Sequence, residues 1–288
     1  MKGCFIRASS YDVIIIGAGL GGLTAAARLV REGLRVLVLD RTLHGGGTAY
    51  TFQRRGFYFP MGPLGFSTPA VVRRTFQSLG EGSSPDLIRV HYRLRAFGLD
   101  LPLSRSSPEL QQELIRLFPE ESGGISRFFA ALKALAPLLQ DFPGEEARRI
   151  LRAAAAVPAR VFLESKIKGG RLKRILGSQG TGEPRGPLLL VAVHWDLLLG
   201  EGIWYPAEGL RVLGDRLSLL VTRPPGKGEI RLGAEAYRIR IRGGKVRGVT
   251  LSSGEDLEAP VVVSNADLLG GAPTSLSLCV HSLVLVVA

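Results

Sequence analysis

The stretch YDVIIIGAGLGGLTAAARL, residues 11 to 29, holds the pattern Gly17-x-Gly19-x-x-Gly22. Residues 12–16, just before the first glycine, are dense in β-branched side chains, which is typical of a buried parallel strand. After the glycines, small and apolar residues recur at helical spacing. The order of strand, glycine turn and helix predicts the opening unit of an α/β fold.

The three glycines suit a backbone that lies close to a bound phosphate. Gly17 permits the tight turn, Gly19 lets the backbone approach a pyrophosphate, and Gly22 lets the helix lie close to the strand. The start of the expected helix, residues 20–32, offers unpaired N–H groups and a partial positive charge to an anion. A phosphate site is therefore expected at this turn.

An acidic residue ends the second expected strand, residues 34–40. Asp40 follows the first glycine at about the 20-residue spacing at which a carboxylate accepts hydrogen bonds from ribose hydroxyls. The same carboxylate disfavours a 2′-phosphate, despite the adjacent Arg41. The sequence thus predicts a dinucleotide site, against the alternative of a glycine-rich turn that binds nothing.

Beyond the second strand, residues 41–63 read RTLHGGGTAYTFQRRGFYFPMGP and show no helical period. A simple NAD domain would usually continue here with a crossover helix. A flexible surface loop would explain the three glycines at 45–47 but not the aromatic residues that follow them. These aromatic residues are Tyr50, Phe52, Phe57, Tyr58 and Phe59.

The segments YDVIIIGAGLGGLTAAARL, LDR, GGTAYTF and GFYFPMGP together resemble the flavoprotein superfamily of phytoene dehydrogenases, carotenoid isomerases and retinol saturases. The resemblance implies FAD as the cofactor, with the first glycines and the acid at its adenosine half and the later glycine pair beside the pyrophosphate. It also implies a backbone contact to the adenine near residue 236. By position, the implied FAD-binding residues are Gly17, Ala18, Gly19, Leu20, Gly22, Asp40, Arg41, Gly46, Gly47, Thr48 and Ala236.

Two positions depart from the family pattern. Thr48 stands where the family commonly has an arginine after the glycine pair. Pro60 and Met61 precede Gly62, where the family commonly has an acidic residue before its Gly-Pro. Both departures concern contacts to the flavin ring more than contacts to the adenosine.

Later segments also resemble the middle of these proteins, where the chain returns to the FAD domain. They are LKRILGSQGTGEP at 172–184 and EGIWYPAEGLRVLGDRL at 201–217. Residues 259–267, APVVVSNAD, are expected to form a strand that rejoins the main sheet.

Alternation between 236 and 242 predicts a strand with two unlike faces. Tyr237, Ile239 and Ile241 share one face, and arginines at 238, 240 and 242 share the other. Gly243-Gly244 then turns the chain into a second strand, 245–251. A solvated sheet face explains the arginines better than a binding surface does.

The segments 107–119 and 124–142 predict amphipathic helices, with Ser107 and Ser122 as caps or flanks. By resemblance, such an inserted helical layer is the substrate-binding and membrane-facing region. Its apolar stripe fits core packing better than a lipid tunnel. The stripe consists of Phe128, Phe129, Leu132, Leu135 and Leu138.

We therefore expect an α/β fold: a Rossmann-like FAD-binding domain, with a parallel sheet, helices and antiparallel hairpins, and an inserted, largely helical substrate region. The FAD-binding domain takes residues 1–70 and 205–267, and the substrate region takes 71–204. Residues 268–288 form an atypical apolar tail where the resemblance stops. A fragment, a spliced form or an altered reading frame is the favoured explanation of this tail, and a short membrane-contacting tail is the alternative.

The net charge of +12 comes from basic residues spread along the chain. Such dispersion argues against nucleic acid as a partner, which needs a contiguous basic face, and leaves an anionic lipid surface or a phosphate-rich cofactor. Cys4 and Cys279 suggest no disulfide framework, and no metal site is expected. Without a signal peptide, we expect a cytoplasmic or peripheral membrane location.

Three functions remain open. The first is an FAD-dependent oxidoreductase that acts on carbon–carbon bonds of apolar isoprenoid-like substrates by hydride transfer, in a complete or truncated form. The second is an amine-oxidase-like flavoprotein on the same scaffold. The third is a catalytically silent protein that binds nucleotides or lipid surfaces. The sequence assigns no catalytic residue.

Overall fold

The computed structural model describes residues 11–62, 65–96, 98–103, 106–135, 138, 144–177, 186–266 and 285–287. Two compact units make up the chain. The first contains residues 1–64, 70–87 and 205–288, and the second contains residues 65–69 and 88–204. The domain boundaries expected from the sequence stay a prediction; residues 70–87 lie with the first unit.

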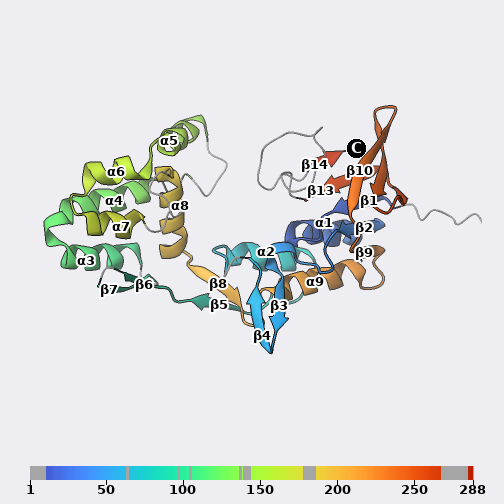
Figure 1. The fold of residues 1–288 in the computed structure, drawn as a ribbon, viewed down its shortest axis with the longest axis horizontal. Helices are drawn as coiled ribbons and strands as arrows, with labels where there is room; N and C mark the ends of the chain where they lie inside the picture. Colours follow the sequence, from blue (N-terminus) through green and yellow to red (C-terminus); the bar gives the residue numbers. More distant parts are fainter. Residues whose placement is uncertain are drawn as a thin grey trace, which may run out of the picture. The chain divides into compact units, whose positions relative to one another are not determined.

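A mainly parallel sheet forms the centre of the first unit, in the strand order β14-β13-β1-β2-β9 (Figure 1). Its parallel strands are β1 (Val13–Ile16), β2 (Val36–Asp40), β9 (Gly228–Leu232) and β13 (Val261–Ser264). The antiparallel edge strand is β14 (Leu285–Val287). The Rossmann-like fold expected from the sequence is confirmed.

Helices cover one face of this sheet and a second, antiparallel sheet covers the other. The helices are α1 (Leu20–Arg31) and α9 (Arg211–Thr222), which pack against each other and on the strands. The second sheet consists of β10 (Ala236–Arg242), β11 (Lys245–Leu251) and β12 (Asp256–Glu258). Ile15 faces the start of α1, whereas its neighbour Ile14 shares a buried cluster with Val246 and Val249. The alternation of β1 thus divides its apolar side chains between two cores.

Strand β10 differs from the regular alternation that its sequence predicts. Its pairing with β11 shifts register between Ala236 and Arg238 and again between Arg240 and Ile241. As a result, Tyr237 is 63% exposed and Ile241 is 60% exposed, so the two do not share a buried face with Ile239. The expected apolar face of β10 is therefore interrupted.

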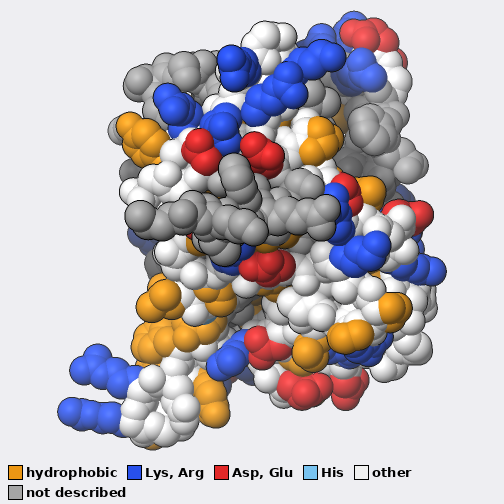
Figure 2. Space-filling view, turned by 90° about the vertical axis from the view of Figure 1, so that its right-hand side faces the viewer, with side chains coloured by type: hydrophobic (Ala, Val, Ile, Leu, Met, Phe, Trp, Pro, Cys, Tyr) orange, Lys and Arg blue, Asp and Glu red, His pale blue; other side chains and the backbone are white. Residues whose placement is uncertain are grey.

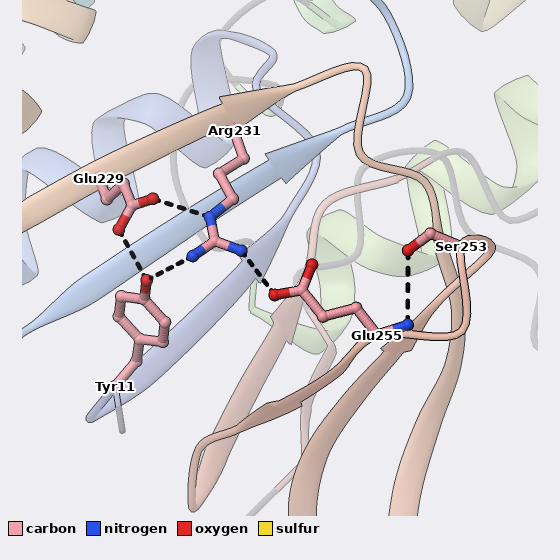
Figure 3. Close-up of polar contacts among 5 residues, drawn as sticks. All are labelled: Tyr11, Glu229, Arg231, Ser253 and Glu255. Atoms are coloured by element: carbon pink, nitrogen blue, oxygen red, sulfur yellow. Dashed lines mark hydrogen bonds and ion pairs between the residues drawn. The ribbon is translucent and has the colours of Figure 1, made fainter. Parts of the chain in front are cut away.

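A polar network fixes the edge strand β9 to its neighbours (Figure 3). The Arg231 guanidinium donates to Glu229 Oε1 (2.7 Å), to Glu255 Oε1 (3.0 Å) and to the Tyr11 hydroxyl (3.1 Å). The Tyr11 hydroxyl in turn donates to Glu229 Oε2 (2.6 Å). Burial would raise the pKa of the Glu229 carboxyl, but hydrogen bonds from Tyr11 and Arg231 lower that pKa overall. The network joins the residues just before β1, the edge strand and the β11–β12 turn.

A short 3₁₀ turn, η1 (Gly47–Ala49), and an isolated hairpin follow β2 in the first unit. The hairpin strands are β3 (Thr51–Arg54) and β4 (Phe57–Pro60), which pair antiparallel. Helix α2 (Pro69–Ser78) comes next. A hairpin at this place in the chain is a feature that the sequence did not predict.

The second unit is largely helical, as expected. Its helices are α3 (Ser107–Leu117), α4 (Ser122–Leu135), α5 (Glu145–Ala156), α6 (Ala159–Lys166), α7 (Gly170–Gly177) and α8 (Leu188–Leu199), with the 3₁₀ turn η2 (Pro119–Glu121). Its strands are β6 (Arg93–Ala96) and β7 (Leu99–Pro102). Two further paired strands, β5 (Leu87–Val90) and β8 (Ile203–Pro206), contain the boundaries between the units.

The core of the second unit is built around Ile125, Phe128 and Trp195, which are fully buried. The Trp195 ring meets Phe128 edge to face, and its Nε1 donates to the Leu176 carbonyl at 2.8 Å. Four residues of the predicted stripe, Phe128, Phe129, Leu132 and Leu135, pack in this core, which agrees with the packing interpretation. The fifth, Leu138, lies beyond the end of α4 and is half-buried.

The N-terminal cap of α3 lies one residue earlier than expected. Ser106, not Ser107, is the cap, and it forms a reciprocal capping box with Glu109. Because such a box needs an acidic residue three positions after the cap, the spacing to Glu109 selects Ser106.

Glu121 is a buried carboxylate in the second unit, only 7% exposed. Its oxygens accept the backbone N–H of Lys168 at 2.9 and 3.1 Å and that of Gly169. This protein anion therefore occupies the space in front of the first turn of α7.

Some sequence expectations lie outside the described residues. They concern Cys4, most of GSQGTGEP, Cys279 and the apolar tail except its strand at 285–287. In the part of the chain that the structure describes, no helix has both the length and the apolar character needed to cross a membrane.

Candidate nucleotide-binding site

Two glycines of the opening pattern are required by the fold itself. Gly17 has a φ of +107°, and a Cβ there would lie 3.0 Å from the Asn265 carbonyl oxygen. A Cβ on Gly22 would lie only 2.0 Å from the Gly17 carbonyl oxygen. Any side chain at these positions would therefore displace the turn or the helix.

Gly19 lies between them but has no such requirement. Its φ of −71° and ψ of 173° form an extended backbone that any residue adopts. Among the described atoms, a Cβ at Gly19 would meet nothing closer than the Gly47 Cα at 4.0 Å. Packing in the described structure therefore does not explain why a glycine stands here, whereas the close approach of a ligand would.

Helix α1 begins beside this open position. Its N-cap is Gly19, and among the described residues no side chain caps it and no acidic residue occupies its first turn. Backbone N–H groups at a helix start attract anions, and the helix dipole adds to this effect. The start of α1 can therefore receive a diphosphate.

Asp40 is held at the carboxyl end of β2 by three hydrogen bonds. The Ala18 N–H donates to its Oδ2 at 2.7 Å, and the Thr42 N–H and hydroxyl both donate to its Oδ1 at 2.8 Å. A carboxylate offers about four acceptor sites, so capacity remains for ribose hydroxyls. Sequence reasoning missed Thr42, although an Asp followed two residues later by a backbone donor is a common turn.

The later glycines lie directly against the first turn. The Gly46 N–H donates to the Ala18 carbonyl at 2.7 Å, and Gly46 has a φ of +94°. A Cβ on Gly47 would lie 3.0 Å from the Gly19 Cα. The structure thus brings together the first glycine turn and the later glycine pair, both of which the resemblance implies as FAD-binding.

Two residues that support this arrangement were missed. Asn265, just after β13, has its side-chain amide against Gly21, where a Cβ would lie 2.5 Å from Oδ1. Gly214 in α9 lets the helix approach Gly46, since a Cβ there would lie 2.9 Å from the Gly46 Cα. An isolated glycine within a helical pattern and a polar residue at the end of a parallel strand were the available signals.

The other predicted site residues lie around the two glycine segments and make fewer contacts with them. Leu20 is the first residue of α1. Thr48 is exposed, and its carbonyl oxygen packs against Gly62. Arg41 lines a groove of about 850 Å³ together with residues 230–235 and with 251–253 and Glu255.

This groove adjoins the end of β2 and includes the residue just before Ala236. The Ala234 N–H donates to the Asp40 carbonyl oxygen at 2.8 Å. Ala236 itself begins β10 and pairs with Leu251. Ala236, the predicted adenine contact, therefore directly follows a residue that lines this groove, and the groove adjoins Asp40, the predicted ribose ligand.

Comparison with known proteins agrees with the Rossmann-like fold. Residues 15–79 match the model of an NAD(P)-binding Rossmann-like domain. The chain is 31% identical over 287 residues to a zeta-carotene-forming phytoene desaturase of Myxococcus xanthus, covering 89% of this chain and 53% of the relative. It is 28% identical over 303 residues to prolycopene isomerase 1 of an Oncidium hybrid cultivar, covering 90% and 49%. The chain thus spans about half the length of these curated relatives.

Solved structures share the fold. An oxidoreductase from Methanosarcina mazei superposes with a TM-score of 0.62 at 19% identity, covering 88% of this chain and 58% of that one. A putrescine oxidase bound to putrescine gives 0.60 at 16% identity, covering 88% and 57%.

The resemblance to phytoene dehydrogenases and carotenoid isomerases is confirmed over most of this chain. These relatives support FAD as the dinucleotide of the site. Among the described residues, no group of three or more potential metal ligands is present.

Proposed function

We propose that this chain is the FAD-binding part of an oxidoreductase, with the cofactor diphosphate against the start of α1. The observation that carries the proposal is the open position at Gly19, where the nearest described atom to an added Cβ is the Gly47 Cα at 4.0 Å. Flanking glycines at 17 and 22 are explained by packing, so Gly19 is the member of the pattern that points to a ligand.

Each predicted site residue has a role in this proposal. The backbone N–H groups at the start of α1 and the Gly46-Gly47 segment would bind the diphosphate. Asp40, oriented by Ala18 and Thr42, would accept hydrogen bonds from the ribose. The groove beside Arg41 and Ala236 would take the adenine end.

The proposed substrates are apolar isoprenoid-like molecules, and the proposed reaction changes a carbon–carbon bond. Bound FAD supplies a hydride acceptor or donor, while the protein provides orientation and exclusion of water. Support for this substrate class comes from the names of the relatives, a phytoene desaturase and a prolycopene isomerase. We assign no catalytic residue. A peripheral contact with a membrane is proposed as well, because such substrates dissolve in lipid.

Amine oxidation is the alternative chemistry, since a putrescine oxidase has the same fold. Fold alone does not select a substrate, and the sequence matches favour the carotenoid-type reaction. Reduction of the bound flavin by a polyene, with no reduction by putrescine, is the expected result. The opposite result would favour the amine-oxidase alternative, and reduction by neither would favour a catalytically silent protein.

The direct test of cofactor identity is an absorbance spectrum of the purified chain after incubation with FAD and removal of unbound cofactor. We expect a flavin spectrum, and release of FAD rather than NAD on denaturation. A colourless protein that retains no flavin would overturn the proposal.

A further inference from the structure

The β3–β4 hairpin exposes an unusual amount of aromatic surface. Phe57 is 70% exposed, Tyr58 68%, Phe59 43% and the following Met61 59%. Among the described strands, β3 and β4 pair only with each other. A two-stranded hairpin is marginally stable in water without a surface to pack on. We therefore expect these side chains to contact another surface.

The cross-strand pairing places the apolar and basic groups on a common face. Phe52 pairs with Phe59 and Arg54 pairs with Phe57, so all four side chains project from one side of the hairpin. The Phe52 and Phe59 rings stack at 5.2 Å. This face is therefore aromatic along its length and basic toward its tip.

The tip carries a second arginine in a strained conformation. Arg55 has a φ of +50° and is the only non-glycine residue with positive φ in the described part of the chain. With Gly56 at +83°, it forms a two-residue turn that favours asparagine or glycine at this position. Arg55 adopts this conformation against its backbone preference, which makes a role for its side chain outside the hairpin a reasonable hypothesis.

The hairpin projects from the first unit. The β3–β4 turn is the lowest part of Figure 1, and the lowest projection in Figure 2 carries Lys or Arg side chains beside hydrophobic ones. Residues 53–59 are all exposed. A projecting finger with charge at its end differs from the flat apolar face expected of a protein dimer interface.

We infer that the β3–β4 hairpin docks on an anionic lipid surface, with Phe57 and Phe59 in the interface and Arg54 and Arg55 on lipid phosphates. Aromatic rings favour the boundary between headgroups and acyl chains, and arginine is attracted to anionic headgroups. This inference rests on the peripheral membrane contact of the proposed function and identifies the hairpin as the surface that makes that contact. It does not depend on FAD.

Sedimentation of the purified chain with phosphatidylcholine vesicles, with and without phosphatidylglycerol, tests this inference. The parent chain should bind the anionic vesicles more tightly, and Arg54→Gln with Arg55→Asn should lower that affinity by roughly 25-fold, or about fivefold per arginine. Phe57→Ser with Phe59→Ser should lower it by at least about tenfold. High salt should weaken the parent strongly, because it screens the arginines.

A matched control comes from strand β10. Tyr237→Ser with Ile241→Ser removes two side chains whose exposure lies between that of Phe59 and that of Phe57 and which also lie among arginines. This control should bind vesicles within about twofold of the parent. Equal losses in the hairpin and control variants would overturn the inference, as would no binding by the parent.

The single change Arg55→Asn distinguishes an effect on vesicle binding from an effect on the stability of the hairpin. Asparagine suits the positive φ, so thermal stability should stay the same or rise while vesicle affinity falls about fivefold. Unchanged affinity would overturn the role of Arg55. The parent chain could instead form a dimer and bind no vesicles. If the Phe57→Ser and Phe59→Ser changes abolished that dimer, the surface would be assigned to a second copy of the chain. Flavin content measured on the same samples should not change, which keeps this test separate from that of the cofactor site.

Discussion

Helices α1 and α7 differ in what lies in front of their N-termini, since Glu121 binds the two residues that precede α7. At α7, the buried Glu121 carboxylate accepts the N–H groups of Lys168 and Gly169. At α1, no described side chain caps the helix, and the first turn holds no acidic residue. The second unit thus supplies its own anion, whereas the first leaves room for one from a ligand.

Because of this difference, we expect changes at the two helix starts to affect different properties, namely stability of the second unit at α7 and cofactor binding at α1. Loss of the internal anion at α7 should destabilise the second unit and leave the cofactor site intact. Changes at the start of α1 should affect cofactor binding, and only those that disturb packing should also affect folding. The following predictions test this separation.

The largest effect is expected for Gly22→Ala. The added Cβ would lie 2.0 Å from the Gly17 carbonyl oxygen, so the helix or the turn has to move. We expect the free energy of unfolding of the first unit to fall by about 3 kcal/mol, with loss of FAD binding. Denaturant unfolding and flavin titration measure the two effects. Wild-type stability in this variant would contradict the packing described at the turn.

Asp40→Ala removes the predicted ribose ligand. We expect FAD binding to weaken by roughly 1.5 to 3 kcal/mol, because hydrogen bonds to a charged group are lost. Titration of the variant with FAD, followed by flavin fluorescence, checks this. Equal FAD affinity of Asp40→Ala and the parent would remove Asp40 from the site. The FAD affinity of Asp40→Asn, which keeps one acceptor oxygen, should lie between those of Asp40→Ala and the parent.

Glu121→Gln tests the internal anion in front of α7. A neutral amide keeps one acceptor oxygen but loses the charge, so we expect the second unit to lose about 2 kcal/mol of unfolding free energy. Flavin binding should stay at the parent level. A parallel loss of flavin would show that the N-termini of α1 and α7 are not independent of each other.

The smallest effect concerns acid stability through Glu229. Its pKa in the folded chain is lowered, so the stabilising contribution is present above the ordinary value of 4.5 and is lost as the pH falls through the folded-state pKa. Because the side chain is 47% exposed, we expect less than about 1 kcal/mol. Unfolding measured across this pH range should depend less on pH in Glu229→Gln than in the parent. An unchanged pH dependence would contradict the network.

Rules that involve only residues close in sequence were sufficient to predict the turn between β1 and α1. Strand, glycines, helix and terminal acid lie close in sequence, and each has its own backbone requirement. The cap of α3 follows a local rule as well, since Glu109 stands three residues after Ser106, but Ser107 was expected in its place. These features depend on neighbours along the chain.

Features that depend on distant contacts were not predicted. Gly214 is required by Gly46, far away in sequence. The interrupted alternation of β10 arises opposite Gly248, which has a φ of +132° and faces the Leu257 carbonyl of the next strand. A flexible loop did not explain the aromatic run at 57–59, but the hairpin that it forms was not predicted, and its side chains are exposed.

The most direct test of the cofactor site is the FAD affinity of Gly19→Val beside that of Gly82→Val. Gly82 is exposed, and a Cβ there meets no described atom within 4 Å, so it provides a matched control. We predict that Gly19→Val loses FAD binding while it unfolds like the control. FAD bound equally tightly by both variants would contradict the placement of the diphosphate at α1.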